Sequence, residues 1–153
     1  MNPRQLRELI EHVLKDAGLY SPAAVELLLL TAAVESNLGE YIKQVGGGPA
    51  RGIFQMEPST EKDLYDNYLQ YRGNRWRTMA RYNSADTRDL WFNLGYQILL
   101  ARMHYMRVPE ALPDPNDILA MAKYWKKYYN TWKGAGTVDK ARLKYLTYVK
   151  NVS

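Results

Sequence analysis

An acidic residue lies at the end of the most apolar stretch of the sequence, where its side chain could acquire catalytic chemistry. The stretch AAVELLLLTAAVES (23–36) places apolar side chains on nearly every face of a helix and reaches Glu35 just before its end. Apolar neighbours disfavour the charged carboxylate, and so does the negative end of the helix dipole. Both effects raise the pKa of Glu35, so that it could donate a proton near neutral pH. The alternative is a solvated glutamate at a fraying helix end, because glutamate is seldom fully buried.

A glycine-rich loop, QVGGGPARG (44–52), follows the apolar stretch. A P-loop is improbable there, because isoleucine follows Gly52 where that motif needs a Lys-Ser/Thr pair opening a helix. The dinucleotide-binding pattern also fails, because Gly46 and Gly48 have no glycine three residues later. Two interpretations stay open: the glycines form a mobile linker, or they let backbone amides and carbonyls approach an extended ligand.

Helical patterns dominate the sequence and predict the elements that position these residues. Ser21-Pro22 is typical of a helix start, with serine as the cap and proline in the first turn. Gly39 is expected to stop this helix, and IFQM (53–56) to form a very short strand or a turn. A first helix is expected to end near Gly18, and another to run from Pro58 through Tyr71, followed by a break at Gly73-Asn74 and a weak helix over 75–82. A long helix is expected from Asp86-Thr87 to Arg107. The last two expected helices are one that is capped by Asp117 and ends at Asn130, and a basic helix over 137–152. The predicted fold class is all-α or mainly α, with at most a minimal strand element.

Size and composition limit the function further. The chain has 153 residues, so a single domain over 1–153 is expected. It contains no cysteine and only two histidines, so we expect no disulfide, no metal site and no cofactor. The net charge of +5 favours anionic partners. No secretory signal and no transmembrane segment are indicated, because the N-terminus is a charged amphipathic helix and the longest apolar run is too short for a bilayer.

Four short stretches resemble, in order, the motifs of lytic transglycosylases, a soluble family related to goose-type lysozymes. They are AVESNLG, GGGPARGIFQMEPST, NLGYQILLAR and YYN, and together they extend over about residues 22–131. The second stretch matches most closely, because its Gly, Gln, Pro and Thr fall at the family's offsets. The third keeps Gly95 and the apolar residues after it, without the asparagine spacing of the family. The fourth places Tyr129 before an asparagine, and Tyr124 is a competing alignment for this position.

The resemblance implies a lysozyme-like fold and assigns roles to several residues. Glu35 would be the catalytic acid. Ser36 and Gln55 would line the cleft and orient the sugars, Met56 would pack near the cleft floor, and Tyr129 would hydrogen-bond the reacting region. Structural alternatives remain for two of them: Gln55 could bond the loop backbone, and Tyr129 could be an ordinary half-buried aromatic residue.

The family's reaction cleaves the β-1,4 bond between N-acetylmuramic acid and N-acetylglucosamine in peptidoglycan. By resemblance, Glu35 protonates the glycosidic oxygen and then, as a base, lets the sugar's own hydroxyl close a 1,6-anhydro ring. Glu57 is a possible second carboxylate, which would suit a lysozyme-type hydrolase of the same bond instead. We expect the transglycosylase, because Glu57 precedes a proline and follows a segment with a buried pattern, so that its side chain is expected to face solvent.

Two other classes of function stay open. The basic charge and the segment RGNRWRTMARYN (72–83) suggest a helical nucleic-acid-binding module, but no groove-reading motif accompanies them, so nucleic acid is not the expected partner. The chain could also be a structural virion protein that kept the fold without the activity.

The expected partner is the glycan strand of peptidoglycan, bound by a monomer. The basic C-terminal helix, with Lys140, Arg142, Lys144 and Lys150, is a solvated face or contacts anionic envelope polymers. The resemblance extends to phage-type endolysins. It predicts synthesis in the host cytoplasm without a signal peptide and action on the cell wall, in the periplasm, after release. A virion-associated location is the alternative.

Overall fold

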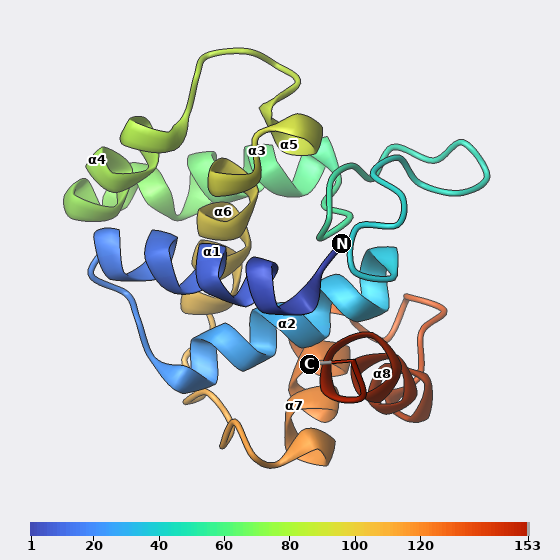
Figure 1. The fold of residues 1–153 in the computed structure, drawn as a ribbon. Helices are drawn as coiled ribbons and strands as arrows, with labels where there is room; N and C mark the ends of the chain where they lie inside the picture. The colour runs from blue at the N-terminus through green and yellow to red at the C-terminus, as the bar shows by residue number, and fades with distance from the viewer. Residues whose placement is uncertain (153) are drawn as a thin grey trace.

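A computed structural model describes residues 1–152, which form a mainly helical protein (Figure 1), as the sequence predicted. The α-helices of this part of the chain are α1 (Pro3–Asp16), α2 (Pro22–Ser36), α3 (Pro58–Asn67), α4 (Gly73–Tyr82), α5 (Asp89–Phe92), α6 (Leu94–Met106), α7 (Ile118–Trp125) and α8 (Val138–Tyr145). Three shorter segments are the 3-10 turn η1 (Leu69–Tyr71) and the π-helical segments η2 (Lys126–Asn130) and η3 (Leu146–Lys150). Two isolated β-bridges, Lys43 with Arg51 and Arg51 with Met56, supply the minimal strand element.

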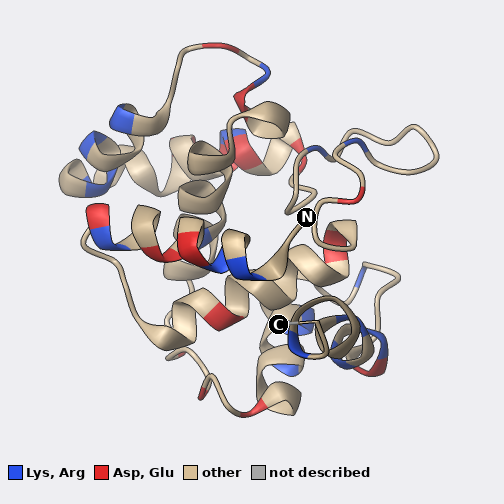
Figure 2. Cartoon of the chain, in the orientation of Figure 1, with Lys and Arg blue, Asp and Glu red and all other residues tan. Residues whose placement is uncertain are grey.

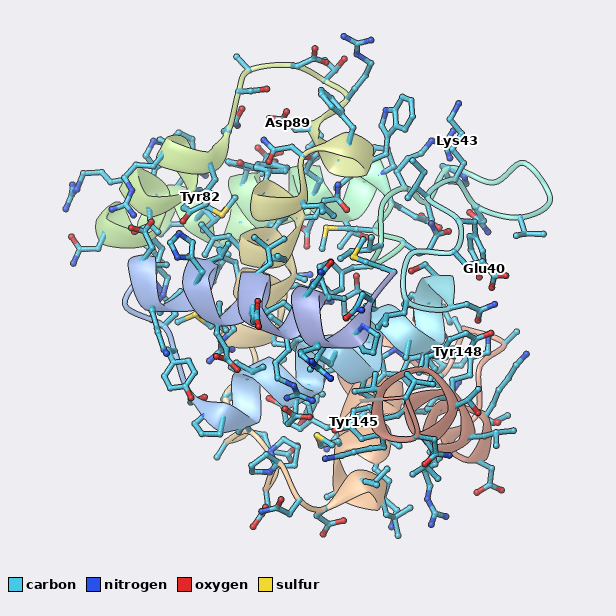
Figure 3. All side chains as sticks on the ribbon, in the orientation of Figure 1. Glu40, Lys43, Tyr82, Asp89, Tyr145 and Tyr148 are labelled. Carbon is cyan, nitrogen blue, oxygen red and sulfur yellow. The ribbon has the colours of Figure 1, made fainter. Side chains whose placement is uncertain are left out.

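The apolar helix α2 lies at the centre of one half of the molecule, in contact with α1, α6, α7 and α8 (Figure 1). It starts as predicted, because the Ser21 hydroxyl accepts the Ala24 N–H at 3.1 Å. The leucines at 27–30 are almost completely buried, and each contributes about 2 kcal/mol by leaving water. Its buried acid, Glu26, is paired with Arg7 and also accepts a hydrogen bond from Tyr145 of α8, the residue that Figure 3 labels. The central helix is therefore fixed by apolar packing and one satisfied polar cluster.

The second half of the molecule is organised around α6, which contacts α1, α3, α4 and α5. The sequence predicted one long helix here, opened by Asp86-Thr87, and this is wrong. The chain forms two helices, α5 and α6, which are separated at Asn93. The backbone of Asn93 is extended, and its side chain caps α6 by accepting the Tyr96 N–H at 3.1 Å. Asparagine caps a helix well because its side-chain oxygen replaces the missing backbone acceptor.

Three other predicted helix boundaries shift. The helix starting at Pro58 ends at Asn67, and only a 3-10 turn continues to Tyr71. The break predicted at Gly73-Asn74 is not there, because Gly73 is the first residue of α4. The core helix ends at Ser36, three residues before Gly39, and the chain then takes left-handed conformations at Asn37, Leu38 and Gly39.

The C-terminal elements follow the predicted order. Asp117 caps α7 by accepting the Ala120 N–H at 2.9 Å, and the helix continues as the π-helical segment η2 up to Asn130. The basic helix α8 packs its buried residues Ala141 and Tyr145 against α2. None of the helices in residues 1–152 combines the length and the apolar character needed to cross a bilayer.

Candidate functional site

A cleft of about 840 Å³ opens where the end of α2, the loop over 41–56, the start of α3 and the segment around η2 meet. The sequence-predicted residues that line it are Glu35, Gln55, Met56, Glu57 and Tyr129. Two other predicted residues, Ser36 and Tyr124, lie outside it. The fold thus brings residues from four separate stretches of sequence to one surface.

Glu35 occupies the last turn of α2 and is partly exposed to the cleft. Burial raises its pKa from an ordinary 4.5 to about 7, although the hydrogen bond from Trp125 and the positive charge of Lys144 both act to lower it. The Trp125 indole N–H donates to the Glu35 Oε2 atom at 3.0 Å. A carboxyl group with this pKa is half protonated at neutral pH, so it can both donate and accept a proton.

The sequence did not predict the hydrogen bond that Trp125 donates to Glu35. Trp125 and Tyr129 are four positions apart on one helical stretch, and Trp125 is 1% exposed. This spacing places both side chains on one helix face, so it could have indicated that they reach the same site.

Tyr129 joins the C-terminal half of the chain to the turn after the glycine loop. Its hydroxyl donates to the Phe54 carbonyl at 2.6 Å, and its ring meets the His104 ring edge-to-face with centroids 5.0 Å apart. Burial raises the pKa of Tyr129 well above its usual value, and the nearby charge of Glu35 raises it further. The competing residue Tyr124 instead donates to the Glu110 carbonyl at 2.9 Å, so the cleft receives Tyr129 and not Tyr124.

The expectation that Ser36 lines the cleft is wrong. Its side chain is completely buried, and its hydroxyl donates to the Ile53 carbonyl at 2.6 Å, with the Ala32 carbonyl at 3.1 Å as a second acceptor. The same oxygen accepts the Gly39 N–H at 2.8 Å. Ser36 therefore joins the end of α2 to the following turn and positions its neighbour Glu35 without touching a ligand.

The segment 52–56 forms a tight turn that presents Gln55 and Met56 to the cleft. Gln55 has a left-handed backbone (φ 47°), and its side-chain amide donates to the Gly52 carbonyl at 2.9 Å. It therefore bonds the loop backbone and lines the cleft as well. Met56 is 4% exposed and packs at the cleft wall, in agreement with the predicted packing role.

Of the two interpretations that the sequence left open for the loop glycines, the approach of their backbone to a ligand is not supported, because none of Gly46, Gly47, Gly48 and Gly52 lines the cleft. Gly52 is buried with φ 82°, and a Cβ there would lie 2.3 Å from the Leu90 carbonyl oxygen, so it is required by packing against α5. Gly46 and Gly47 lie at the loop tip with positive φ and no atoms within 4 Å of a Cβ position. The loop contributes side chains to the cleft at other positions, which are Gln44, Val45 and Ala50.

Side chains on the outer part of the loop hold it against α5. The Lys43 ammonium lies 4.7 Å from the centre of the Trp91 ring (Figure 3 labels Lys43). At the inner part, the Ile53 N–H donates to the buried Gln97 side chain of α6 at 3.0 Å. Both ends of the glycine loop are thereby attached to the α5–α6 region.

Two further carboxyl groups line the cleft in different environments. Glu57 is exposed and sits at the start of α3, with the Ser59 hydroxyl 3.4 Å from its Oε2 atom. Since Met56 is buried and Glu57 exposed, the chain leaves the core here, as predicted. Asp63 forms an ion pair with Arg107 at 2.6 Å, and this hydrogen bond holds the pKa of Asp63 below its usual value. Burial thus raises the pKa of Glu35, whereas the hydrogen bond from Arg107 lowers that of Asp63.

The basic C-terminal helix contributes to the site and is not only a solvated face. The Lys144 ammonium is partly buried and donates to the Asn37 side chain at 2.5 Å, at the end of α2. Its charge favours the ionised form of Glu35. Lys140 and Arg142 of the same helix are exposed.

Residues 1–152 contain no group of three or more His, Asp or Glu side chains arranged to hold a metal ion. Comparison of the chain with protein-family models, with curated proteins and with solved structures yields no match. The assignment of a function therefore depends on the geometry of the cleft and on the resemblance of the four motifs.

Proposed function

We propose that the protein is a peptidoglycan-degrading enzyme with a lysozyme-like fold, which cleaves the β-1,4 bond between N-acetylmuramic acid and N-acetylglucosamine. The observation that carries the proposal is a half-buried carboxyl group, Glu35, with a pKa of about 7 in a cleft of about 840 Å³. A general acid works best when its pKa lies near the pH of the reaction. The match of GPARGIFQMEPST (48–60) to the lytic transglycosylase motif supplies the substrate class.

The proposed reaction uses Glu35 twice. Its carboxylic acid protonates the glycosidic oxygen, while the N-acetyl group of the sugar stabilises the positive charge at the anomeric carbon. The Trp125 N–H, 3.0 Å from Oε2, stabilises the carboxylate that forms. This carboxylate then takes the proton of the sugar's own 6-hydroxyl, which attacks the anomeric carbon and closes a 1,6-anhydro ring.

The environment of Glu57 favours transglycosylation over hydrolysis. An inverting hydrolase needs a second carboxylate that is fixed opposite the acid to activate water. Glu57 lines the same cleft but is exposed, and its one hydrogen bond, from Ser59, is long at 3.4 Å. We therefore expect Glu57→Gln to keep most of the activity. The alternative is the two-carboxylate hydrolase, for which the position of Glu57 at the cleft is the supporting observation.

Mass spectrometry of digested peptidoglycan tests the proposal. Purified protein should release fragments that end in 1,6-anhydro-N-acetylmuramic acid and are one water, about 18 mass units, lighter than hydrolysis products. Glu35→Gln should release none while keeping its circular dichroism spectrum. Reducing-end muramic acid as the main product, together with loss of activity in Glu57→Gln, would establish the hydrolase. Unchanged turnover in Glu35→Gln would exclude Glu35 as the acid.

The proposal includes a cellular setting, which the resemblance to phage-type endolysins supports. The protein would be made in the host cytoplasm and reach the cell wall after release, acting as a monomer on glycan strands. Exposed Lys140 and Arg142 of α8 would aid its encounter with anionic envelope polymers. Immunoblots of purified virions and of the soluble lysate separate this role from the virion-associated one, because only the latter predicts the protein in virions.

A further inference from the structure

A second pocket, of about 340 Å³, lies at the start of α4 and shares no lining residue with the cleft. One part of its wall is apolar, with Leu19 and Met103. The other part is polar and basic, with Arg72, Asn74 and Arg75. Neither Asp nor Glu lines it among the described residues. The pocket thus combines a cationic wall with an apolar one.

Three arginines meet around one aromatic ring beside this pocket. The guanidinium carbons of Arg72 and Arg75 lie 5.2 and 6.0 Å from the centre of the Tyr68 ring. Arg102 of α6 belongs to the same cluster, because burial and then the positive charge of Arg75 lower its pKa. The cluster therefore brings like charges close together, with Arg72 exposed and Arg75 and Arg102 partly buried.

No carboxylate of residues 1–152 forms a salt bridge with any of these three arginines, whereas Arg7, Arg81 and Arg107 elsewhere each have an acidic partner. The Nε atoms of Arg75 and Arg102 are buried without a hydrogen-bond partner. Helix α4 carries Lys or Arg positions and no Asp or Glu (Figure 2). A buried N–H group without an acceptor is costly, and the two Nε–H groups lack one within residues 1–152, so an anion beside the cluster would supply both an acceptor and a counter-charge.

We propose that this pocket binds a phosphomonoester. The guanidinium groups of Arg72 and Arg75 can donate paired N–H bonds to phosphate oxygens, which is the geometry in which arginine recognises phosphate. The side chain of Asn74 accepts a hydrogen bond from Arg77, and its own NH₂ group donates to nothing in residues 1–152, so it is a further donor for the ligand. A dianionic group matches several converging positive charges.

The volume and the apolar wall indicate what is attached to the phosphate. A pocket of about 340 Å³ is larger than a bare phosphate requires, and Leu19 and Met103 offer contacts to an organic group. Both a small soluble phosphoester and the headgroup of an anionic lipid carry this chemistry. The two sources differ in whether the ligand is free in solution or held at a membrane surface.

Isothermal titration calorimetry with glycerol 1-phosphate, at constant ionic strength, tests the site. The pocket variant is Arg72→Gln/Arg75→Gln, and the matched control is Arg4→Gln/Lys123→Gln, which removes the same charge from exposed positions outside the pocket. We expect saturable binding to the wild type and the control, and binding at least tenfold weaker to the pocket variant. Absence of saturable binding to the wild type, or equal affinity in the pocket variant, would overturn the proposal.

Thermal unfolding provides a second measurement on the same proteins. Without ligand, the pocket variant should melt close to the wild type, because the substitutions break no ion pair and the repulsion they remove offsets the loss of the cation–π contacts with Tyr68. Glycerol 1-phosphate should raise the melting temperature of the wild type and the control only. Should the double variant fail to fold, Arg72→Gln alone serves, since Arg72 is exposed. An equal ligand-induced rise in wild type and variant contradicts the site.

Sedimentation with vesicles then distinguishes the source of the phosphate. Vesicles of phosphatidylcholine with phosphatidic acid should retain the wild type and the control, but not the pocket variant, if the ligand is a lipid headgroup. Equal retention of all three proteins, with pocket-dependent binding of glycerol 1-phosphate, assigns a soluble phosphoester. Vesicle binding without binding of glycerol 1-phosphate shows a general surface attraction and refutes the pocket.

Discussion

Replacing Glu35 by glutamine should abolish catalysis and, at neutral and higher pH, stabilise the fold. Glutamine resembles the protonated acid in size and neutrality, and its side-chain oxygen can still accept the Trp125 N–H. The wild-type side chain must ionise in a partly buried position as the pH rises, whereas glutamine remains neutral. The cost of that ionisation sets the size of the effect.

The magnitude follows from the pKa of Glu35, which burial raises from 4.5 to about 7. Each pKa unit corresponds to about 1.4 kcal/mol, so the folded state loses about 3 kcal/mol when Glu35 ionises. The folded state binds the proton more tightly than the unfolded chain. The free energy of unfolding therefore decreases as the pH rises from about 4.5 to about 7 and stays at the lower value above that range.

Urea unfolding at several pH values measures this effect. We expect Glu35→Gln and the wild type to have similar free energies of unfolding at pH 4, and the variant to be more stable by about 3 kcal/mol at pH 8. Glu57→Gln is the matched control, because Glu57 is exposed in the same cleft and its neutralisation should change stability little. If the difference in free energy of unfolding between the wild type and Glu35→Gln is the same at pH 4 and pH 8, Glu35 is not a buried group that binds a proton in this range.

Two further substitutions test the surroundings of the acid. Trp125→Phe removes the N–H that stabilises the carboxylate form of Glu35. Hydrogen bonds to charged groups contribute about 1.5–3 kcal/mol, so the pKa of Glu35 should rise by about one unit or more in this variant. The alkaline fall of wall-lysis activity should then move to higher pH, but not in the control Tyr124→Phe, whose hydroxyl bonds a distant carbonyl. Gly52→Val should lower the free energy of unfolding by more than about 3 kcal/mol in urea titrations, because a Cβ would lie 2.3 Å from the Leu90 carbonyl oxygen; unchanged stability contradicts this packing role.

The sequence predicted the parts of the fold that depend on local patterns. The apolar run that forms α2, the Ser21 cap and the Asp117 cap follow from residues close together in the chain. The elevated pKa of Glu35 could be predicted for the same reason, because its apolar neighbours and helix end are local. The break at Asn93 was missed because apolar residues continue through it at helical spacing, and a single capping side chain ends the pattern.

The parts of the site that could not be predicted depend on contacts between distant residues. Trp125 donates to an acid 90 positions earlier, and its local spacing from Tyr129 indicates a shared site but not which acid accepts the bond. The need for glycine at position 52 arises from a carbonyl of α5, which neither a mobile linker nor an approach to a ligand, the two interpretations left open by the sequence, would require. Ser36 was expected at the cleft by resemblance to the family motif, but successive residues of a helix face different sides, and Ser36 is buried.

The four motif stretches converge on one short piece of backbone, and this explains why residues that touch no ligand belong to the site. Ser36 of the first stretch bonds the Ile53 carbonyl, Gln97 of the third accepts the Ile53 N–H, and Tyr129 of the fourth bonds the Phe54 carbonyl. Ile53 and Phe54 belong to the second stretch, and both are buried. Because these bonds come from α2, α6 and η2, the turn cannot shift without moving the helix end that carries the acid. These bonds hold the turn at Ile53 and Phe54 against the end of α2 that carries Glu35, and the proposed reaction through one carboxyl group would need such fixed positions.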